Sequence, residues 1–230
     1  MKKVICFSLW GEDPRYTKGA IRNVELAKLI YPDWICRFYV GTSTPKDIVD
    51  KLRLFDNVEI IDMGVEGDWT GMFWRFGAAA DKSVSVMLSR DTDSRLTLRE
   101  KYAVEEWLDS DFDFHIMRDH PYHSTEILGG MWGVKANVLT NMNELISDYV
   151  KGDFWQVDQN FLREKIWPLV SQNSFTHDEF FSHVFGPSKP YKFKRDPKHF
   201  IGQAYDGDDK ILDDDAYFTD YVYINLYNII

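Results

Sequence analysis

The sequence predicts an α/β protein: a single Rossmann-like domain in which a mainly parallel central sheet is flanked by helices. Three observations support this prediction. Continuous apolar runs such as Val4 to Leu9 are typical of strands buried on both faces of a parallel sheet. These runs alternate with segments whose apolar residues recur at helical spacing, as expected for parallel βαβ units. The chain has 230 residues and neither an internal repeat nor a linker, so one domain is expected.

Local signals set the expected ends of several helices. Pro32 is expected to end the first helix, and Thr44 and Pro45 to be the N-cap and first residue of the second. Thr97 and Glu100 match a capping box. Strands are expected at residues 4–9, 34–40, 58–61, 84–89, 112–117 and 126–134, and helices at 20–31, 44–52, 71–80, 97–108, 139–149 and 158–167, the last ending before Pro168.

The composition excludes several classes of protein. A net charge of −10 argues against a nucleic-acid partner, because phosphate backbones are bound through clustered Lys and Arg. Hydrophobic and aromatic shares of 44% and 16% argue against disorder. Cys6 and Cys36 fall in expected strands, which favours buried reduced thiols and a reducing compartment. No stretch reaches the length of a membrane span, so we expect a cytoplasmic protein with no integral membrane segment.

Two carboxylates follow the expected strand at 84–89. One residue separates Asp91 from Asp93, so in an extended chain their side chains leave from the same face and converge. Hard oxygen ligands at the carboxyl end of a buried strand suit a divalent cation that also holds a diphosphate. An isolated Asp-x-Asp in an acidic protein is more often a turn or a solvated loop, and the remaining motifs decide between the two.

Further candidate residues lie on both sides of this motif. Arg75, the only cation of the helix at 71–80, is either a surface residue or a partner for an aspartate or a phosphate. The stretch 118–123, which includes Asp119, is unusually rich in titratable groups. The pair Gly129–Gly130 allows a ligand or backbone to approach closely. Asp158 and Gln159 begin a short helix, near its positive end.

In this order the motifs resemble those of GT-A glycosyltransferases, most of all the glycogenin and lipopolysaccharide-galactosyltransferase type. That family carries Asp-x-Asp, a glycine-containing strand, an Asp-Gln-Asp-x-Leu-Asn element and a His-x-x-Gly-x-x-Lys-Pro element. The matching stretches here are 91–93, 129–130, 158–162 and 183–190. The stretch 118–135 also resembles bacterial and viral sugar transferases. The resemblance extends from residue 4 to about residue 191, with Asn160, Arg163 and Tyr191 departing from the family pattern.

The resemblance implies a metal-dependent enzyme that moves a sugar from a nucleotide-diphospho-sugar, UDP-linked by preference, to a glycan or polysaccharide acceptor. Mn²⁺ (or Mg²⁺) would be bound by Asp91, Asp93 and His183, and mixed carboxylate and imidazole ligands suit manganese better than calcium. Without its spacing to Lys189, His183 would instead be read as packed among phenylalanines. Donor binding is expected from Ser8, Leu9, Tyr16, Arg75, Asp91, Gly186 and Lys189, with Asp91 on the ribose and Lys189 on the diphosphate.

The stereochemistry of transfer stays open. Inversion would need a carboxylate base near the acceptor hydroxyl, with Asp158 as first candidate and Asp119 as second. Retention would use the leaving phosphate, with Gln159 near the sugar.

Two other readings remain. A haloacid-dehalogenase-like phosphohydrolase also uses Asp-x-Asp, usually after its first strand. An inactive GT-A domain would bind the nucleotide-sugar without transferring it. Residues 1–230 are expected to form one domain, with about 192–230 an appended tail and the acidic run at 206–215 a solvated loop.

Overall fold

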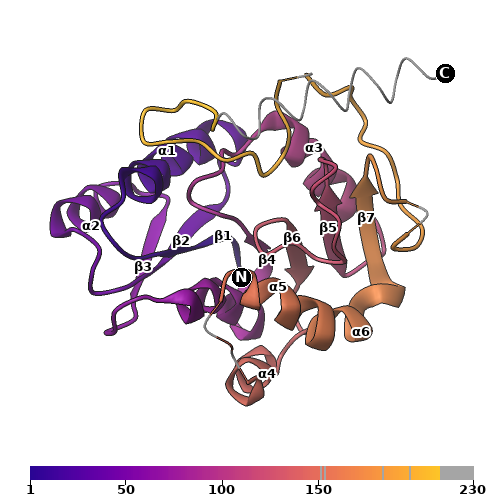
Figure 1. The fold of residues 1–230 in the computed structure, drawn as a ribbon, viewed down its shortest axis with the longest axis horizontal. Helices are drawn as coiled ribbons and strands as arrows, with labels where there is room; N and C mark the ends of the chain where they lie inside the picture. Colours follow the sequence, from indigo (N-terminus) through magenta and orange to yellow (C-terminus); the bar gives the residue numbers. More distant parts are fainter. Residues whose placement is uncertain (151, 153, 183, 197, 213–230) are drawn as a thin grey trace.

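The computed structural model describes residues 1–150, 152, 154–182, 184–196 and 198–212, which fold around one seven-stranded sheet (Figure 1). The strand order is β3-β2-β1-β4-β6-β5-β7. Only β6 runs antiparallel to its neighbours β4 and β5 among the described strands, so the predicted mainly parallel sheet is confirmed. The strands are β1 (Lys2–Leu9), β2 (Ile35–Val40), β3 (Val58–Asp62), β4 (Val84–Ser89), β5 (Phe114–Arg118), β6 (Trp132–Lys135) and β7 (Ser174–Asp178).

Helices cover both faces of the sheet, and each face has its own apolar core (Figure 1). On one face lie α1 (Pro14–Ile30), α2 (Lys46–Arg53) and α3 (Leu98–Leu108), whose Trp107 is fully buried. On the other lie the 3₁₀ helix η1 (Trp69–Ala80), α4 (Met142–Asp148) and α5 (Val157–Phe161), followed by the helical turns η2 (Leu162–Ile166), α6 (Trp167–Val170) and η3 (Ser171–Asn173). Strands buried on both faces explain the continuous apolar runs of the sequence.

Most predicted elements are confirmed to within a few residues, and the exceptions have local causes. Thr44 does not cap α2: its hydroxyl donates to the Leu9 carbonyl, and Pro45 takes the N-cap position. The helix expected to end before Pro168 continues, because Pro168 falls in the first turn of α6, where its missing N–H is no loss. The strand expected at 126–134 is shorter, since residues 126–131 form a loop.

Two smaller predictions are confirmed. Cys6 and Cys36 are buried free thiols. Thr97 caps α3 by accepting a hydrogen bond from the Glu100 amide at 3.2 Å, although the Glu100 side chain pairs with Arg90 and does not close the box. Within the described residues, we find no helix with the length and apolarity to cross a membrane.

Candidate active site

A cavity of about 830 Å³ opens at the carboxyl ends of β1 and β4, and we call it the main cavity. The end of β1, the start of α1, η1, the turn after β4, the β5–β6 loop and the start of α5 all contribute to its wall. Four carboxylates and two guanidinium groups line it, from Asp68, Asp91, Asp93, Asp158, Arg15 and Arg75. The predicted residues Ser8, Tyr16 and Gln159 lie on the same wall.

The Asp-x-Asp turn is held in place by α1, and each of its carboxylates faces an arginine. The Asn23 amide donates to the carbonyls of Thr92 and Ser94 at 3.2 and 2.8 Å, which anchors the turn. Asp93 Oδ2 accepts from Arg15 Nε and Nη2 at 2.9 and 2.5 Å. Asp91 Oδ1 accepts from Arg75 Nη1. Both carboxylates therefore open into one cavity, as a shared ligand requires.

Arg75 is buried and bridges two separate parts of the site. Besides Asp91, its Nη1 donates to the Arg90 carbonyl, and its Nη2 lies 3.4 Å from Asp158 Oδ2. Its Nε is buried without a hydrogen-bond partner among the described residues. Of the two interpretations of Arg75, the structure supports the partner of an aspartate and not the surface residue.

Gly129 and Gly130 make room for the acidic groups of the site. A Cβ on Gly130 would overlap Asp91 Oδ2, and one on Gly129 would overlap Asp158 Oδ2. The close approach predicted for these glycines is therefore to two aspartate side chains. Any larger residue at either position would displace a carboxylate from the cavity wall.

Burial changes the proton affinity of two of these carboxylates. It raises the pKa of Asp93, the neighbouring Asp91 charge adds to the shift, and Arg15 opposes it. Burial likewise raises the pKa of Asp158, although Arg75 opposes the shift. Perturbed carboxyl groups in a concave site are typical of functional positions.

The charge of the cavity and its donor atoms fit a divalent cation. Four carboxylates outnumber two guanidinium groups, so a diphosphate would be repelled here unless a cation neutralised part of that charge. Carboxylate oxygens are the ligands that Mg²⁺ and Mn²⁺ accept readily. Asp91 and Asp93 supply two such groups; the described residues contain no cluster of three His, Cys, Asp or Glu suited to a metal. His183, the predicted third ligand, lies outside the described residues.

Two predicted site residues are buried away from the cavity wall. The Leu9 side chain belongs to the apolar core, and its carbonyl accepts from the Gly41 amide and the Thr44 hydroxyl. Asp119 is fully buried and accepts from Arg99 through both oxygens, at 2.9 and 3.0 Å, and from the Ile201 amide. A carboxylate enclosed in this way cannot reach an acceptor hydroxyl, so Asp119 cannot act as the base.

The segment expected to hold the diphosphate lies beside β7. The Lys189 amide donates to the Thr176 carbonyl, and its ammonium group pairs with Glu106 on α3. Gly186 adopts a φ of 95° in the turn before it, and neither residue lines the main cavity. The expected roles of Gly186 and Lys189 therefore need correction: this segment pairs with β7, at the edge of the sheet, and does not line the cavity that contains Asp91.

A later segment takes the place beside the aspartates. Gly202 and Ala204 line the main cavity, and the Tyr205 amide donates to the Asp93 carbonyl at 2.9 Å. Residues up to 206 thus belong to the domain, and the expected tail from about 192 is wrong for this part of the chain. The sequence contains a signal that could have indicated this segment: His199 and Gly202 repeat the His-x-x-Gly spacing of the predicted motif.

Several further residues of the wall were missed, among them two tryptophans and a histidine. Trp69 and Trp155 line the cavity with 42% and 69% of their surfaces exposed. His123 lines it from the β5–β6 loop, within the polar stretch that the sequence marked as unusual. Exposed aromatic side chains in a cavity are a recognised sign of a binding surface.

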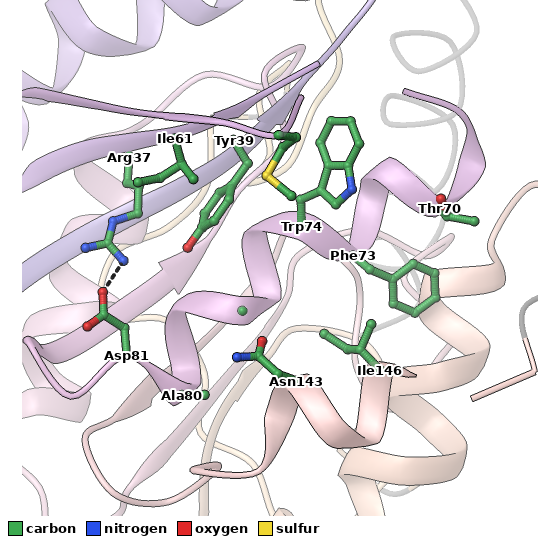
Figure 2. A pocket seen from close by; sticks show the side chains of 12 residues that line it. Arg37, Tyr39, Ile61, Thr70, Phe73, Trp74, Ala80, Asp81, Asn143 and Ile146 are labelled. Atoms are coloured by element: carbon green, nitrogen blue, oxygen red, sulfur yellow. Dashed lines mark hydrogen bonds and ion pairs between the residues drawn. The ribbon is translucent and has the colours of Figure 1, made fainter. Parts of the chain in front are cut away.

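A second cavity, of about 600 Å³, is lined by other residues of η1 together with residues of β2, β3 and α4 (Figure 2). Its wall is largely apolar, with Tyr39, Trp74 and Ile146 among the side chains that face it. At one end Arg37 Nη1 donates to Asp81 Oδ2 at 2.7 Å, the dashed contact in Figure 2. None of the predicted site residues lies here.

The arrangement of strands and helices is shared with solved glycosyltransferases, although no family model and no curated protein matches the sequence. One is a glycosyltransferase involved in the glycosylation of the major capsid of PBCV-1 (TM-score 0.51, 17% identity, covering 77% of this chain and 82% of that one). Another is TarS of S. aureus (TM-score 0.50, 13% identity, 83% and 59%). A third is the mannosyltransferase PcManGT from Pyrobaculum calidifontis, solved with GDP-Man and Mn²⁺ (TM-score 0.50, 9% identity, 82% and 56%). The chain therefore has the GT-A fold of glycosyltransferases, as its motifs predicted.

Proposed function

We propose that the protein is a metal-dependent glycosyltransferase that moves a sugar from a nucleotide-diphospho-sugar, UDP-linked by preference, to a glycan or polysaccharide acceptor. The observation that carries the proposal is the convergence of Asp91, Asp93, Arg75 and Asp158 on one cavity of a GT-A fold, at the carboxyl ends of β1 and β4. The cavity has the volume of a small-molecule site. The Pyrobaculum calidifontis neighbour was solved with a nucleotide-sugar and a cation of the proposed classes.

Mn²⁺ or Mg²⁺ would be bound by Asp91, Asp93 and an imidazole. When bound, the cation would act as a Lewis acid that stabilises the charge of the departing diphosphate. The chain offers two imidazoles at His-x-x-Gly spacing, His183 and His199. His199 Nδ1 lies 3.3 Å from the hydroxyl of Tyr205, whose amide donates to the Asp93 carbonyl.

The protein's own groups would position the reacting sugar and accept a proton. Arg75 fixes Asp91 relative to Asp158, so cation and sugar subsites keep one geometry. Asp158, with its raised pKa and its place on the cavity wall, suits a base for the acceptor hydroxyl in an inverting reaction. In a retaining reaction the leaving phosphate would take that proton, with Gln159 beside the sugar. The proposed function includes both the inverting and the retaining reaction.

The acceptor would lie on the exposed aromatic residues of the cavity. Trp69 and Trp155 are exposed on the cavity wall, and the apolar face of a sugar ring would pack on their indole rings while its hydroxyls stay solvated. A glycan acceptor fits such a wall better than a small polar acceptor does.

The phosphohydrolase alternative is disfavoured by the position of the Asp-x-Asp. It follows β4, the fourth strand along the chain, whereas a haloacid-dehalogenase-like nucleophile is expected after the first. An inactive nucleotide-sugar-binding domain is separated from an enzyme by the outcome of the experiment below.

A thermal-shift screen of UDP-glucose, UDP-galactose and UDP-N-acetylglucosamine, with and without Mn²⁺, tests the proposal. We expect one donor to stabilise the protein only when Mn²⁺ is present, by about 2.7 kcal/mol at 100 times its Kd. Asp93→Ala should abolish this stabilisation, whereas Asp81→Ala, in the second cavity, should retain it.

Turnover then separates the remaining readings. Release of UDP from the stabilising donor supports a transferase, and stabilisation without release of UDP or transfer of sugar supports the inactive domain. Hydrolysis of a phosphomonoester such as p-nitrophenyl phosphate, with no response to any nucleotide-sugar, would refute the proposal.

A further inference from the structure

His123 lies on the wall of the main cavity, and one of its two ring nitrogens is already engaged. The residue is 8% exposed. Its Nδ1 accepts a hydrogen bond from the Asp119 backbone amide at 3.0 Å. The ring also packs on His120 and Phe200, with centroids 5.7 and 5.6 Å away. Hydrogen bond and packing together fix the orientation of the imidazole.

This contact decides which nitrogen carries the proton. A backbone amide is only a donor, so Nδ1 must present its lone pair, and the neutral ring then carries its hydrogen on Nε2. Burial lowers the pKa of His123 well below its usual value, and the neighbouring His120, Arg195 and Arg118 act in the same direction. The ring therefore stays neutral near pH 7, and Nε2 is an N–H donor.

Nε2 has no hydrogen-bond partner among the described residues. It is also not one of their side-chain atoms that are both buried and without a partner. Since His123 is part of the cavity wall, a ligand in the cavity is a partner that this N–H can reach. The β5–β6 loop that carries His123 lies across β4 from β1 in the sheet order. With the nucleotide at the β1 end, beside the expected donor-binding residues Ser8 and Tyr16, the sugars would lie on the side of His123.

We propose that His123 is a donor-only imidazole, whose Nε2–H donates to a sugar hydroxyl oxygen and so determines which sugar is accepted. This inference rests on the proposed function. It also excludes two other roles for His123. A nitrogen that carries the hydrogen has no lone pair for a cation, so His123 is not a metal ligand; for the same reason it is not the general base.

Nitrogen-15 NMR of histidine-labelled protein tests the tautomer without any enzymatic activity. We expect the His123 signals, assigned by their loss in His123→Gln, to show an unprotonated Nδ1 and a protonated Nε2 at pH 7. An Nδ1–H tautomer or an imidazolium at that pH would overturn the inference. Titration of Mn²⁺ by electron paramagnetic resonance should give the same affinity for His123→Leu and wild type, and a tenfold loss in His123→Leu would contradict the donor-only role.

Kinetics with the donor that stabilises the wild-type protein test the hydrogen bond to the sugar. His123→Leu keeps the bulk and loses the donor, and we expect kcat/KM to fall by about 10- to 100-fold. His123→Gln places an amide N–H near the position of Nε2 and should remain within about threefold of wild type. Equal losses in both variants, with unchanged urea unfolding curves, would overturn the inference.

Two further comparisons show whether His123 contacts the transferred sugar or the acceptor, and separate this inference from the proposed function. A loss in both donor hydrolysis and transfer places the contact on the transferred sugar, whereas a loss in transfer alone places it on the acceptor. If the wild-type protein binds none of the nucleotide-sugars, the proposed function fails, and the sugar contact with it. If it binds and turns over a donor but His123→Leu does so equally well, only the present inference fails.

Discussion

The two cavities that η1 helps to line, of about 600 and 830 Å³, differ in how their charged groups are paired. Each contains one buried arginine, Arg75 in the main cavity and Arg37 in the second (Figure 2). Arg37 donates to Glu59 and Asp81 at 2.7 Å, and both carboxylates are also partly solvated. Arg75 instead bridges to Asp158, which is only 4% exposed, through a longer contact of 3.4 Å.

The proton affinities of the carboxylates follow this difference. Although burial opposes the shift, hydrogen bonds from Ser83 and Arg37 lower the pKa of Asp81. In the main cavity, burial raises the pKa of Asp93 and of Asp158 despite their arginine partners. Incompletely compensated carboxylate charge therefore distinguishes the main cavity, the proposed functional site, from the second cavity, since cavity volume alone does not separate the two.

The largest effect is expected when the arginine of each cavity is removed. Arg75→Met leaves the buried Asp158 without its partner, and we expect the free energy of unfolding to fall by about 3–5 kcal/mol. Arg37→Met should cost about 1–2 kcal/mol, because water can reach Glu59 and Asp81. Urea denaturation at pH 7 measures both losses.

A double variant checks the cause. Adding Asp158→Asn to Arg75→Met removes the unpaired charge and should recover at least 1 kcal/mol, roughly the cost of leaving a buried polar group unsatisfied. If the two arginine variants were equally destabilised, the distinction between the cavities would be lost.

A smaller effect is expected from adding one methyl group to a glycine of each cavity. In Gly130→Ala the new Cβ overlaps Asp91 Oδ2, and we expect kcat/KM for the donor to fall by about 100-fold, since small displacements in an active site have effects of this size. In Gly77→Ala the Cβ meets only the Asn143 side-chain oxygen, 3.1 Å away, which can move aside. Its kcat/KM should stay within about threefold of wild type. Equal losses in the two variants would mean that the main cavity is no more sensitive to geometry than the second.

The sequence predicted the parts of the molecule that depend on local pattern. Apolar runs identified β1 to β4. Asp91 and Asp93, which were expected to converge on one cation in an extended chain, lie in a turn, and both line the main cavity. The glycine pair was recognised as a place of close approach, although its partners could be named only from the structure.

The later part of the site depends on contacts between residues far apart in the chain. Arg118 pairs with Asp178, sixty positions away, and Asp119 accepts from Ile201, so no local spacing reports either contact. β7 was not predicted because it contains polar residues such as His177, which is buried and hydrogen-bonded to His115 and Glu106. The role expected of Lys189 failed for the same reason: its backbone pairs with this unpredicted strand.

The smallest effect is expected in the pH dependence of stability that Asp81 and Asp93 cause. Because the pKa of Asp81 is lowered in the folded state, its stabilisation is complete above the ordinary aspartate pKa and is lost as pH falls through the folded value. Asp81→Ala should therefore cost about 1 kcal/mol at pH 7. The pKa of Asp93 is raised, so the folded state binds the extra proton, and stability falls as pH rises through the window between the ordinary and the raised value.

Asp93→Asn should thus leave the free energy of unfolding at pH 7 unchanged or raise it by up to about 1 kcal/mol. The difference from wild type should shrink as pH falls toward the ordinary aspartate pKa, because the folded wild-type protein then binds the proton that its raised pKa favours. Urea denaturation of both variants at pH 7 and pH 4.5, without added metal, measures whether each substitution raises or lowers the free energy of unfolding. If Asp93→Asn were destabilised as much as Asp81→Ala, Asp93 would be a structural ion-pair residue like Asp81. A neutral or stabilising substitution that also abolishes Mn²⁺-dependent donor binding would identify a carboxylate retained for function at a cost in stability.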